Sequence, residues 1–264
     1  MDGGSMKQMR HKSFSEKINH DDTLDALVSG YPSHRFIANP PSHFVNQYLV
    51  NYVLKFSENH LNKKADTLKI LDWGCGKGHI TYLFRQQGIP VASCDIVDEK
   101  DDSAFGQDTP ILDKLNIDVV PLTHPFELPF DSSSFDVIVS FGVLEHVPND
   151  LNSLKEIHRV LKPGGLFFCF FLPYTYSWTQ KIAHLQGDFY HDHFYNEKIV
   201  RNLLRDSKLT LLDFWHRALL PKTVGNYPAH QTVERFDQFV CRYTFLRHLA
   251  TNVEFVAQKD LTYQ

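Results

Sequence analysis

The chain has 264 residues, of which 42% are apolar and 22% are charged, and this balance is typical of a folded globular protein rather than a disordered one. The formal net charge of −4 argues against a dedicated nucleic-acid-binding protein, which normally carries a basic surface. No apolar run approaches the roughly 20 residues of a membrane span, and no signal peptide opens the chain, so we expect a cytoplasmic protein.

The N-terminal part of the chain changes character near residue 40. We expect residues 1–40 to form a partly flexible extension and residues 41–264 to form a single domain. A helix should begin at Ser42, because apolar side chains recur at helical spacing from Phe44 to Phe56. The preceding Asn-Pro-Pro-Ser segment, residues 39–42, is interpreted as a turn before this helix.

Short apolar runs then alternate with helical patterns. Strands are predicted at 68–73, 91–96, 117–121, 135–141 and 166–172, and the helices between them begin near Ile80 and at Asn149 or Asp150. This alternation predicts a parallel sheet with helices on both faces. The remainder is less regular: an aromatic and histidine-rich segment at 174–193, a helix capped by Asn196, strands at 209–214 and 253–257, and a helical region at 231–249.

A glycine-rich turn, residues 72–78 (DWGCGKG), follows the first predicted strand. Such a turn between a strand and a helix lets the backbone approach a ligand at the carboxyl edge of a sheet. The dinucleotide pattern GxGxxG would need glycine where His79 stands, and a P-loop would need Ser or Thr after Lys77. Asp72 would repel a pyrophosphate, but it suits the cationic amino and sulfonium groups of S-adenosylmethionine.

A second acid, Asp95, ends the next strand about 20 residues beyond the turn. An acid at this place accepts hydrogen bonds from the ribose hydroxyls of a nucleoside. This feature fits dinucleotides and S-adenosylmethionine equally, so it predicts nucleoside binding without choosing between them.

These motifs resemble those of class I S-adenosylmethionine-dependent methyltransferases, in the small-molecule branch related to ubiquinone-type enzymes. The turn is similar to their first motif, and residues 126–138, 143–147 and 161–165 match the next motifs in order and spacing. The resemblance covers about residues 40–172. It implies a doubly wound, Rossmann-like α/β fold with a seven-stranded, mostly parallel sheet whose last strand is antiparallel, plus an N-terminal helix and a cap after strand five.

The resemblance also implies that residues 41–264 form a single methyltransferase domain with two functional parts. Residues 41–172 would form the cofactor-binding core, and 173–250 the substrate-side insert and variable C-terminal part. The cofactor-binding residues would be Asp72, Trp73, Gly74, Cys75, Gly76, Gly78, Asp95, Ile96 and Phe141. Among these, the acid and glycines of the turn would line the methionine half, Asp95 would bind the ribose, Ile96 would pack on the adenine, and Phe141 would close the site. The family usually has an acid near the adenine amine where this chain has His124.

We therefore expect methyl transfer from S-adenosylmethionine, with S-adenosylhomocysteine as product, to an oxygen or nitrogen of a small-molecule, glycan or lipid-linked acceptor. A hydroxyl acceptor would need a base, for which His191 and His193 are the candidates because imidazole titrates near neutral pH. No metal is expected, since the four cysteines form no CxxC pair and the histidine pair lacks an evident third ligand.

Two alternatives stay open. One is a non-catalytic partner or S-adenosylmethionine-binding subunit with the same fold. The other is an NAD(P)-dependent oxidoreductase, which His79 and Asp72 disfavour. We expect no nucleic-acid partner, and the sequence does not determine the oligomeric state.

Overall fold

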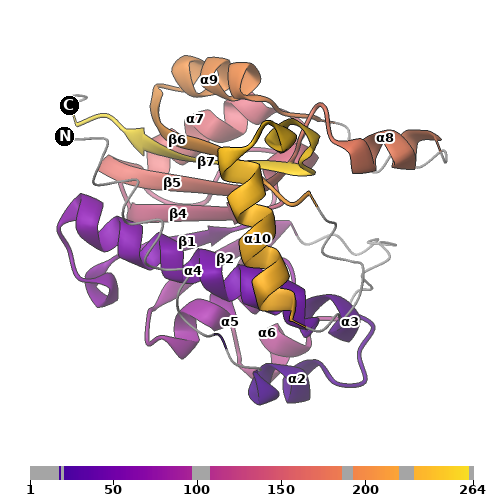
Figure 1. The fold of residues 1–264 in the computed structure, drawn as a ribbon. Helices are drawn as coiled ribbons and strands as arrows, with labels where there is room; N and C mark the ends of the chain where they lie inside the picture. Colours follow the sequence, from indigo (N-terminus) through magenta and orange to yellow (C-terminus); the bar gives the residue numbers. More distant parts are fainter. Residues whose placement is uncertain (1–17, 19–20, 97–107, 186–192, 220–228, 262–264) are drawn as a thin grey trace.

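A seven-stranded sheet runs through the computed structural model, which describes residues 18, 21–96, 108–185, 193–219 and 229–261 (Figure 1). The strands are β1 Ile70–Trp73, β2 Val91–Ile96, β3 Val119–Leu122, β4 Phe135–Phe141, β5 Leu161–Pro173, β6 Leu209–Arg217 and β7 Asn252–Lys259. The α-helices are α2 Asp22–Val28, α3 His34–Ile37, α4 Pro40–Leu61, α5 His79–Gln86, α6 Pro110–Lys114, α7 Asp150–Val160, α8 Trp178–Leu185, α9 Glu197–Asp206 and α10 His230–Tyr243. Short 3₁₀ helices are η1 Ala65–Thr67, η2 Leu144–His146 and η3 Phe245–Leu249.

The strand order, β3-β2-β1-β4-β5-β7-β6, confirms the predicted fold class. Neighbouring strands from β3 through β5 pair in parallel, whereas β7 pairs antiparallel with both β5 and β6. The carboxyl ends of β1, β2 and β4 therefore meet at one edge of the sheet, and the predicted cofactor residues follow these strands.

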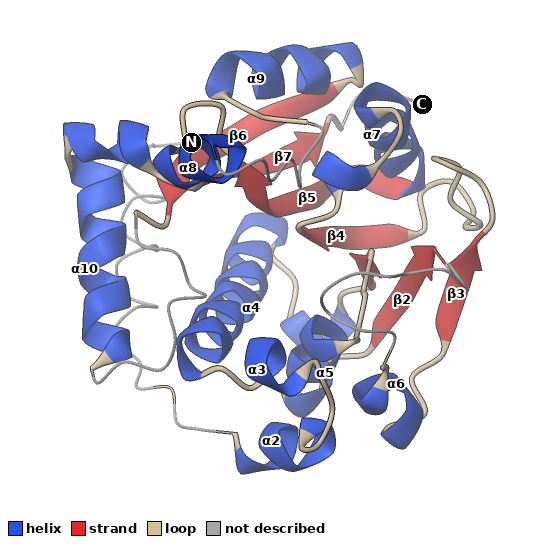
Figure 2. Cartoon of the chain, turned by 90° about the vertical axis from the view of Figure 1, so that its right-hand side faces the viewer, coloured by secondary structure: helices blue, strands red, loops and turns tan. Residues whose placement is uncertain are grey.

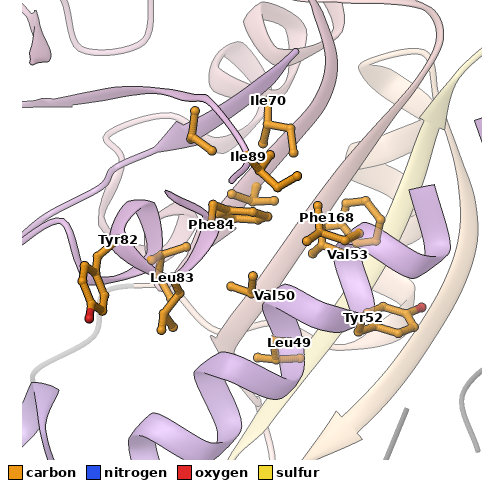
Figure 3. Close-up of a cluster of buried hydrophobic side chains, with 14 of the residues drawn as sticks. Leu49, Val50, Tyr52, Val53, Ile70, Tyr82, Leu83, Phe84, Ile89 and Phe168 are labelled. Carbon is orange, nitrogen blue, oxygen red and sulfur yellow. The ribbon is translucent and has the colours of Figure 1, made fainter. Parts of the chain in front are cut away.

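Helices cover both faces of the sheet, as the nearly continuous apolar strands require. Helices α4 and α5 lie on one face, and α7 and α9 lie on the other (Figures 1 and 2). Figure 3 shows the first of these layers, where Val50 and Val53 of α4 pack with Phe84 of α5 and Phe168 of β5. This packing anchors the helix that follows the glycine-rich turn against the sheet.

Asparagine side chains begin three of the helices. Asn149 accepts a hydrogen bond from the Asn152 amide at 2.9 Å, and Asn196 accepts one from the Ile199 amide at 3.1 Å, which confirms two predicted caps. The expectation that Ser42 caps α4 is wrong, because Asn39 is the cap and the two prolines after it occupy the first helical turn.

The N-terminal extension contains more structure than expected. Helix α2 begins at Asp22, capped by Asp21, and its Leu24 and Val28 are buried in the core beside α4. Helices α6 and α8 were also not predicted, since both are short and carry weak periodic signals. No helix of the described residues combines the length and apolar character that crossing a bilayer requires.

A β-bulge interrupts β5 near its carboxyl end. Phe171 has φ of +66°, and the register with β7 shifts between Cys169 and Leu172. Phe170 and Phe171 consequently both contact the ring of Phe141, at centroid distances of 4.7 and 5.8 Å, where strict alternation would place them on opposite faces. The bulge thus builds an aromatic wall beside the carboxyl end of β4.

Candidate functional site

The glycine-rich turn joins β1 to α5 in a left-handed backbone conformation. Gly74, Gly76 and Gly78 have φ values of +72°, +49° and +79°. The amides of Gly74 and Cys75 both donate to the carbonyl oxygen of Cys94, at 2.9 and 3.2 Å, and these bonds fasten the turn to the end of β2.

Two of these glycines differ in what surrounds them. A methyl group at Gly74 would overlap the side chain of Val143, so close packing excludes any larger residue there. At Gly76 an added Cβ would meet no atom of the described residues within 4 Å. Gly76 therefore faces open space, and a ligand can approach the backbone of the turn at that position.

Asp72, at the carboxyl end of β1, is only 1% exposed. Its Oδ2 accepts a hydrogen bond from the Thr81 hydroxyl at 2.7 Å, and that hydroxyl lies 2.8 Å from the Ser93 hydroxyl. Burial raises the pKa of Asp72 to about 7, and the nearby charge of Asp95 adds to the effect against the lowering hydrogen bond from Thr81. A cation bound nearby would favour the charged form of this carboxylate.

Asp95 lies directly across from the turn. Its two carboxylate oxygens accept hydrogen bonds from the backbone amides of Gly76 and Ile96. Burial raises the pKa of Asp95 in spite of these bonds. Each oxygen still has a second lone pair for a ribose hydroxyl. Beside it, Ile96 is 55% exposed, which leaves an apolar surface next to the acid where an adenine ring would pack.

Two predicted cofactor residues have their side chains in the protein interior, and a third, Phe141, is partly buried. Trp73 and Cys75 are buried, with the Trp73 ring 6.4 Å from that of Phe167, so only their backbone could face a ligand. Phe141 packs against the aromatic wall of β5. The structure therefore brings the two acids and the glycine-rich turn together at one sheet edge, where Gly76 and Ile96 are exposed and Gly78 is buried against Leu112.

Glu145 is a buried carboxylate just after β4, within the motif at residues 143–147. It is 3% exposed, and its Oε1 would lie 3.4 Å from a Cβ built on Gly142. Its Oε2 has no hydrogen-bond partner among the described residues. Burial, helped by the charge of Asp150, raises the pKa of Glu145 to about 8, so this side chain is largely protonated at neutral pH.

Asp150 connects the start of α7 to the predicted histidine region. Its Oδ2 accepts a hydrogen bond from the Tyr195 hydroxyl at 2.9 Å, and the same hydroxyl donates to the Leu144 carbonyl oxygen at 3.0 Å. Its Oδ1 lies 2.7 Å from Nδ1 of His193. His193 is thus held by a carboxylate, whereas His191 lies outside the described residues.

His124 stands at the position where the family usually has an acid, and its side chain makes contacts within its own loop. Its Nδ1 accepts a hydrogen bond from the Glu127 amide at 3.0 Å, and its ring contacts Phe126 at a centroid distance of 4.5 Å. No cluster of three His, Cys, Asp or Glu side chains suited to a metal ion occurs in the described part of the chain.

Comparison with known proteins agrees with this arrangement. Residues 71–169 match the model of a family described as a methyltransferase domain. The chain is 31% identical over 124 residues to the ubiquinone biosynthesis O-methyltransferase of Rickettsia bellii, an alignment covering 47% of this chain and 50% of that protein. It is 49% identical over 57 residues to the demethylmenaquinone methyltransferase of Staphylococcus epidermidis, covering 20% of this chain and 23% of that protein. The chain thus spans half or less of the length of these curated relatives.

The fold also has solved counterparts. The structure of a candidate sarcosine dimethylglycine methyltransferase from Galdieria sulphuraria superposes with a TM-score of 0.57, at 19% identity, over 83% of this chain and 87% of that one. At this identity the likeness concerns the fold alone. Residues 71–169 are therefore similar to the methyltransferase domain family, and the sheet that contains them has a Rossmann-like fold shared with the superposed structure.

Proposed function

We propose that this protein transfers a methyl group from S-adenosylmethionine to a small-molecule acceptor. The observation that carries the proposal is the exposed backbone at Gly76 beside two acids at the carboxyl ends of adjacent strands, the buried Asp72 and the half-buried Asp95. Anions with raised pKa values gain free energy from a bound cation, and the backbone at Gly76 is free for close approach. A pyrophosphate at the same place would be repelled.

S-adenosylmethionine, when bound, supplies a methyl group already activated by a positive sulfur. The protein then has to align the acceptor with the methyl carbon and to exclude water. Asp95 and the exposed Ile96 would hold the nucleoside end, while Asp72 would favour the cationic end. The aromatic wall of Phe141, Phe170 and Phe171 would keep the transfer region apolar.

The finer proposal concerns the acceptor atom. One relative is named a ubiquinone biosynthesis O-methyltransferase, and its name supports a hydroxyl acceptor. Such an acceptor must lose a proton, and we assign that proton to His193, whose other nitrogen faces Asp150. This orientation by a carboxylate stabilises the imidazolium that forms. Glu145, protonated at neutral pH, would serve as a hydrogen-bond donor to the acceptor oxygen.

The experiment measures S-adenosylhomocysteine release with a panel of phenols, catechols and quinols as acceptors, and with amines as the comparison. We expect turnover with a hydroxyl acceptor, and a loss of about 10²-fold or more in turnover for His193→Asn with unchanged S-adenosylmethionine affinity. His191→Ala is the matched variant within the same segment. Unchanged turnover of His193→Asn from pH 6 to pH 9 would remove His193 from the mechanism. Lack of turnover with every acceptor, despite cofactor binding, would instead favour a non-catalytic binding subunit.

A further inference from the structure

A partly open cavity lies away from the glycine-rich turn. Helix α10 crosses α4 and the end of β6 (Figure 1), and a cavity of about 230 Å³ lies among these three elements. Its lining contains none of the residues assigned to the cofactor. The elements come from opposite ends of the chain, so no local sequence motif marks this cavity.

The walls of the cavity are aromatic and firmly held. The ring of Tyr52 on α4 meets that of Trp215 on β6 at 5.7 Å, edge to face, and Trp215 lies 6.3 Å from Phe170. Tyr48 and Phe239 complete the apolar lining. The volume is below the roughly 300–1,000 Å³ of sites for drug-sized ligands, so the space suits a compound of about one or two rings.

Two buried nitrogen donors of the lining have no hydrogen-bond partner in the parts of the chain that the structure describes. Arg217 is 4% exposed, and its Nε donates to Glu254 Oε2 at 2.6 Å, but its Nη1 is unsatisfied. Nε2 of Gln238, on α10, is the other unsatisfied donor. Leaving a donor of this kind buried and unpaired is unfavourable, and a ligand oxygen that accepts a hydrogen bond from it would remove this cost.

The charged side chains that line the cavity have one sign. Among the described residues, Arg217, Arg235 and Arg242 contribute to the lining, and no acidic side chain does. Acids nearby include Glu254, which pairs with Arg217, and Glu234, whose charge also acts on Arg217, as well as the buried Asp237 of α10. A bound anion therefore meets three guanidinium groups, and Glu254 pairs with that of Arg217.

We propose that this cavity binds a small amphipathic anion, with one or two apolar rings against Tyr52 and Trp215 and a carboxylate or phosphate on Arg217, Gln238 and Arg235. The ligand has this chemistry because the aromatic walls exclude water from its rings, while the unsatisfied donors and the arginines require oxygen atoms with negative charge. The site is distinct from the cofactor site and does not depend on methyl transfer.

Three ligands of matched shape test the proposal by calorimetry: 2-naphthoate, 2-naphthyl phosphate and the neutral 2-naphthamide. We expect the anions to bind at one site and the amide to bind at least tenfold more weakly. The tighter of the two anions identifies the preferred anionic group. Equal binding of the amide, or no binding of either anion, would overturn the proposal.

Variants locate the site. Gln238→Leu and Arg235→Gln should each weaken 2-naphthoate binding about tenfold, and Arg201→Gln, which removes the same charge from an exposed position of α9, should leave it unchanged. Replacing Arg217 alone would bury an unpaired carboxylate, so it is tested as Arg217→Gln together with Glu254→Gln, with the folded state checked by thermal denaturation. Binding that persists unchanged in Gln238→Leu and in the double variant would place the ligand elsewhere.

The two proposals fail separately. Asp72→Asn should weaken S-adenosylmethionine binding and leave the 2-naphthoate affinity of this cavity unaltered. A protein that binds 2-naphthoate but not S-adenosylmethionine would refute the proposed function and keep the cavity proposal.

Discussion

The charge of Asp72 links stability and cofactor binding in opposite directions, and Asp72→Asn separates the two. Asparagine has nearly the same size, and its side-chain oxygen can accept the hydrogen bond that Thr81 now donates to Asp72 at 2.7 Å. The substitution therefore removes a buried negative charge with little change in packing.

The expected stability change follows from the pKa. Burial raises the pKa of Asp72 from 3.8 to about 7, a shift of roughly three units that corresponds to about 4 kcal/mol. Because the folded state binds this proton more tightly, the contribution to stability is complete below pH 4 and is lost as the pH rises through 7. Above pH 7 the ionised Asp72 lowers the free energy of unfolding of the wild type by up to about 4 kcal/mol, and at pH 5.5 this loss should be about half as large. Asp72→Asn should therefore unfold at higher urea concentration than the wild type at pH 8, with a smaller difference at pH 5.5.

The expected effect on cofactor binding has the other sign. The ionised fraction of a carboxyl with a pKa near 7 rises about tenfold between pH 6 and pH 8, so the affinity of the wild type for S-adenosylmethionine should rise by about that factor. The affinity of Asp72→Asn should be lower at pH 8 and should lack this rise. Calorimetric titrations at both pH values, with urea denaturation on the same samples, measure both effects. Equal affinities and identical pH profiles for the two proteins would refute the reasoning.

Four further substitutions test other parts of the account. Gly76→Ala should lower the free energy of unfolding by only roughly 1–2 kcal/mol, the cost of a positive φ for alanine, and should reduce S-adenosylmethionine affinity at least tenfold. Gly74→Ala should lower the melting temperature further, because its methyl group would overlap Val143. Tyr195→Phe removes a buried hydroxyl with two hydrogen bonds and should destabilise the protein by about 1–3 kcal/mol in urea denaturation. Burial acts to raise the pKa of Asp136, but hydrogen bonds from two lysines outweigh burial and lower the pKa. The stability that results is present above pH 4 and is lost below it. Asp136→Asn should therefore be less stable than the wild type at pH 7, and its stability should depend less on acid. An Asp136→Asn curve parallel to that of the wild type down to pH 3 would contradict this.

Local signals explain why much of the fold was predictable. The strands β2 and β4 begin and end at the predicted residues, because each is a short apolar run bounded by turn residues. The caps Asn149 and Asn196 were also found, since capping acts over three residues. The cap of α4 was assigned to Ser42 because Asn39 stands before two prolines, where the sequence reads equally well as a turn.

The candidate site was predictable to the extent that it follows strand ends. Asp72, the glycines and Asp95 could be placed because the carboxyl ends of adjacent parallel strands meet at one edge. The protonation of Asp72 and Glu145 could not, since it depends on burial by residues distant in the sequence. The bulge at Phe171 gives no sequence signal because a bulky residue rarely takes a positive φ.

The central claim is that the turn and its two acids bind a nucleoside carrying a positive sulfur. Calorimetric titration of the wild type with S-adenosylmethionine and with NAD, repeated on a protein carrying both Asp72→Asn and Asp95→Asn, tests it most directly. The account predicts saturable single-site binding of S-adenosylmethionine to the wild type, no heat with NAD, and strongly weakened binding to the double variant. Saturation by NAD, or undiminished S-adenosylmethionine binding without the two aspartates, would contradict it.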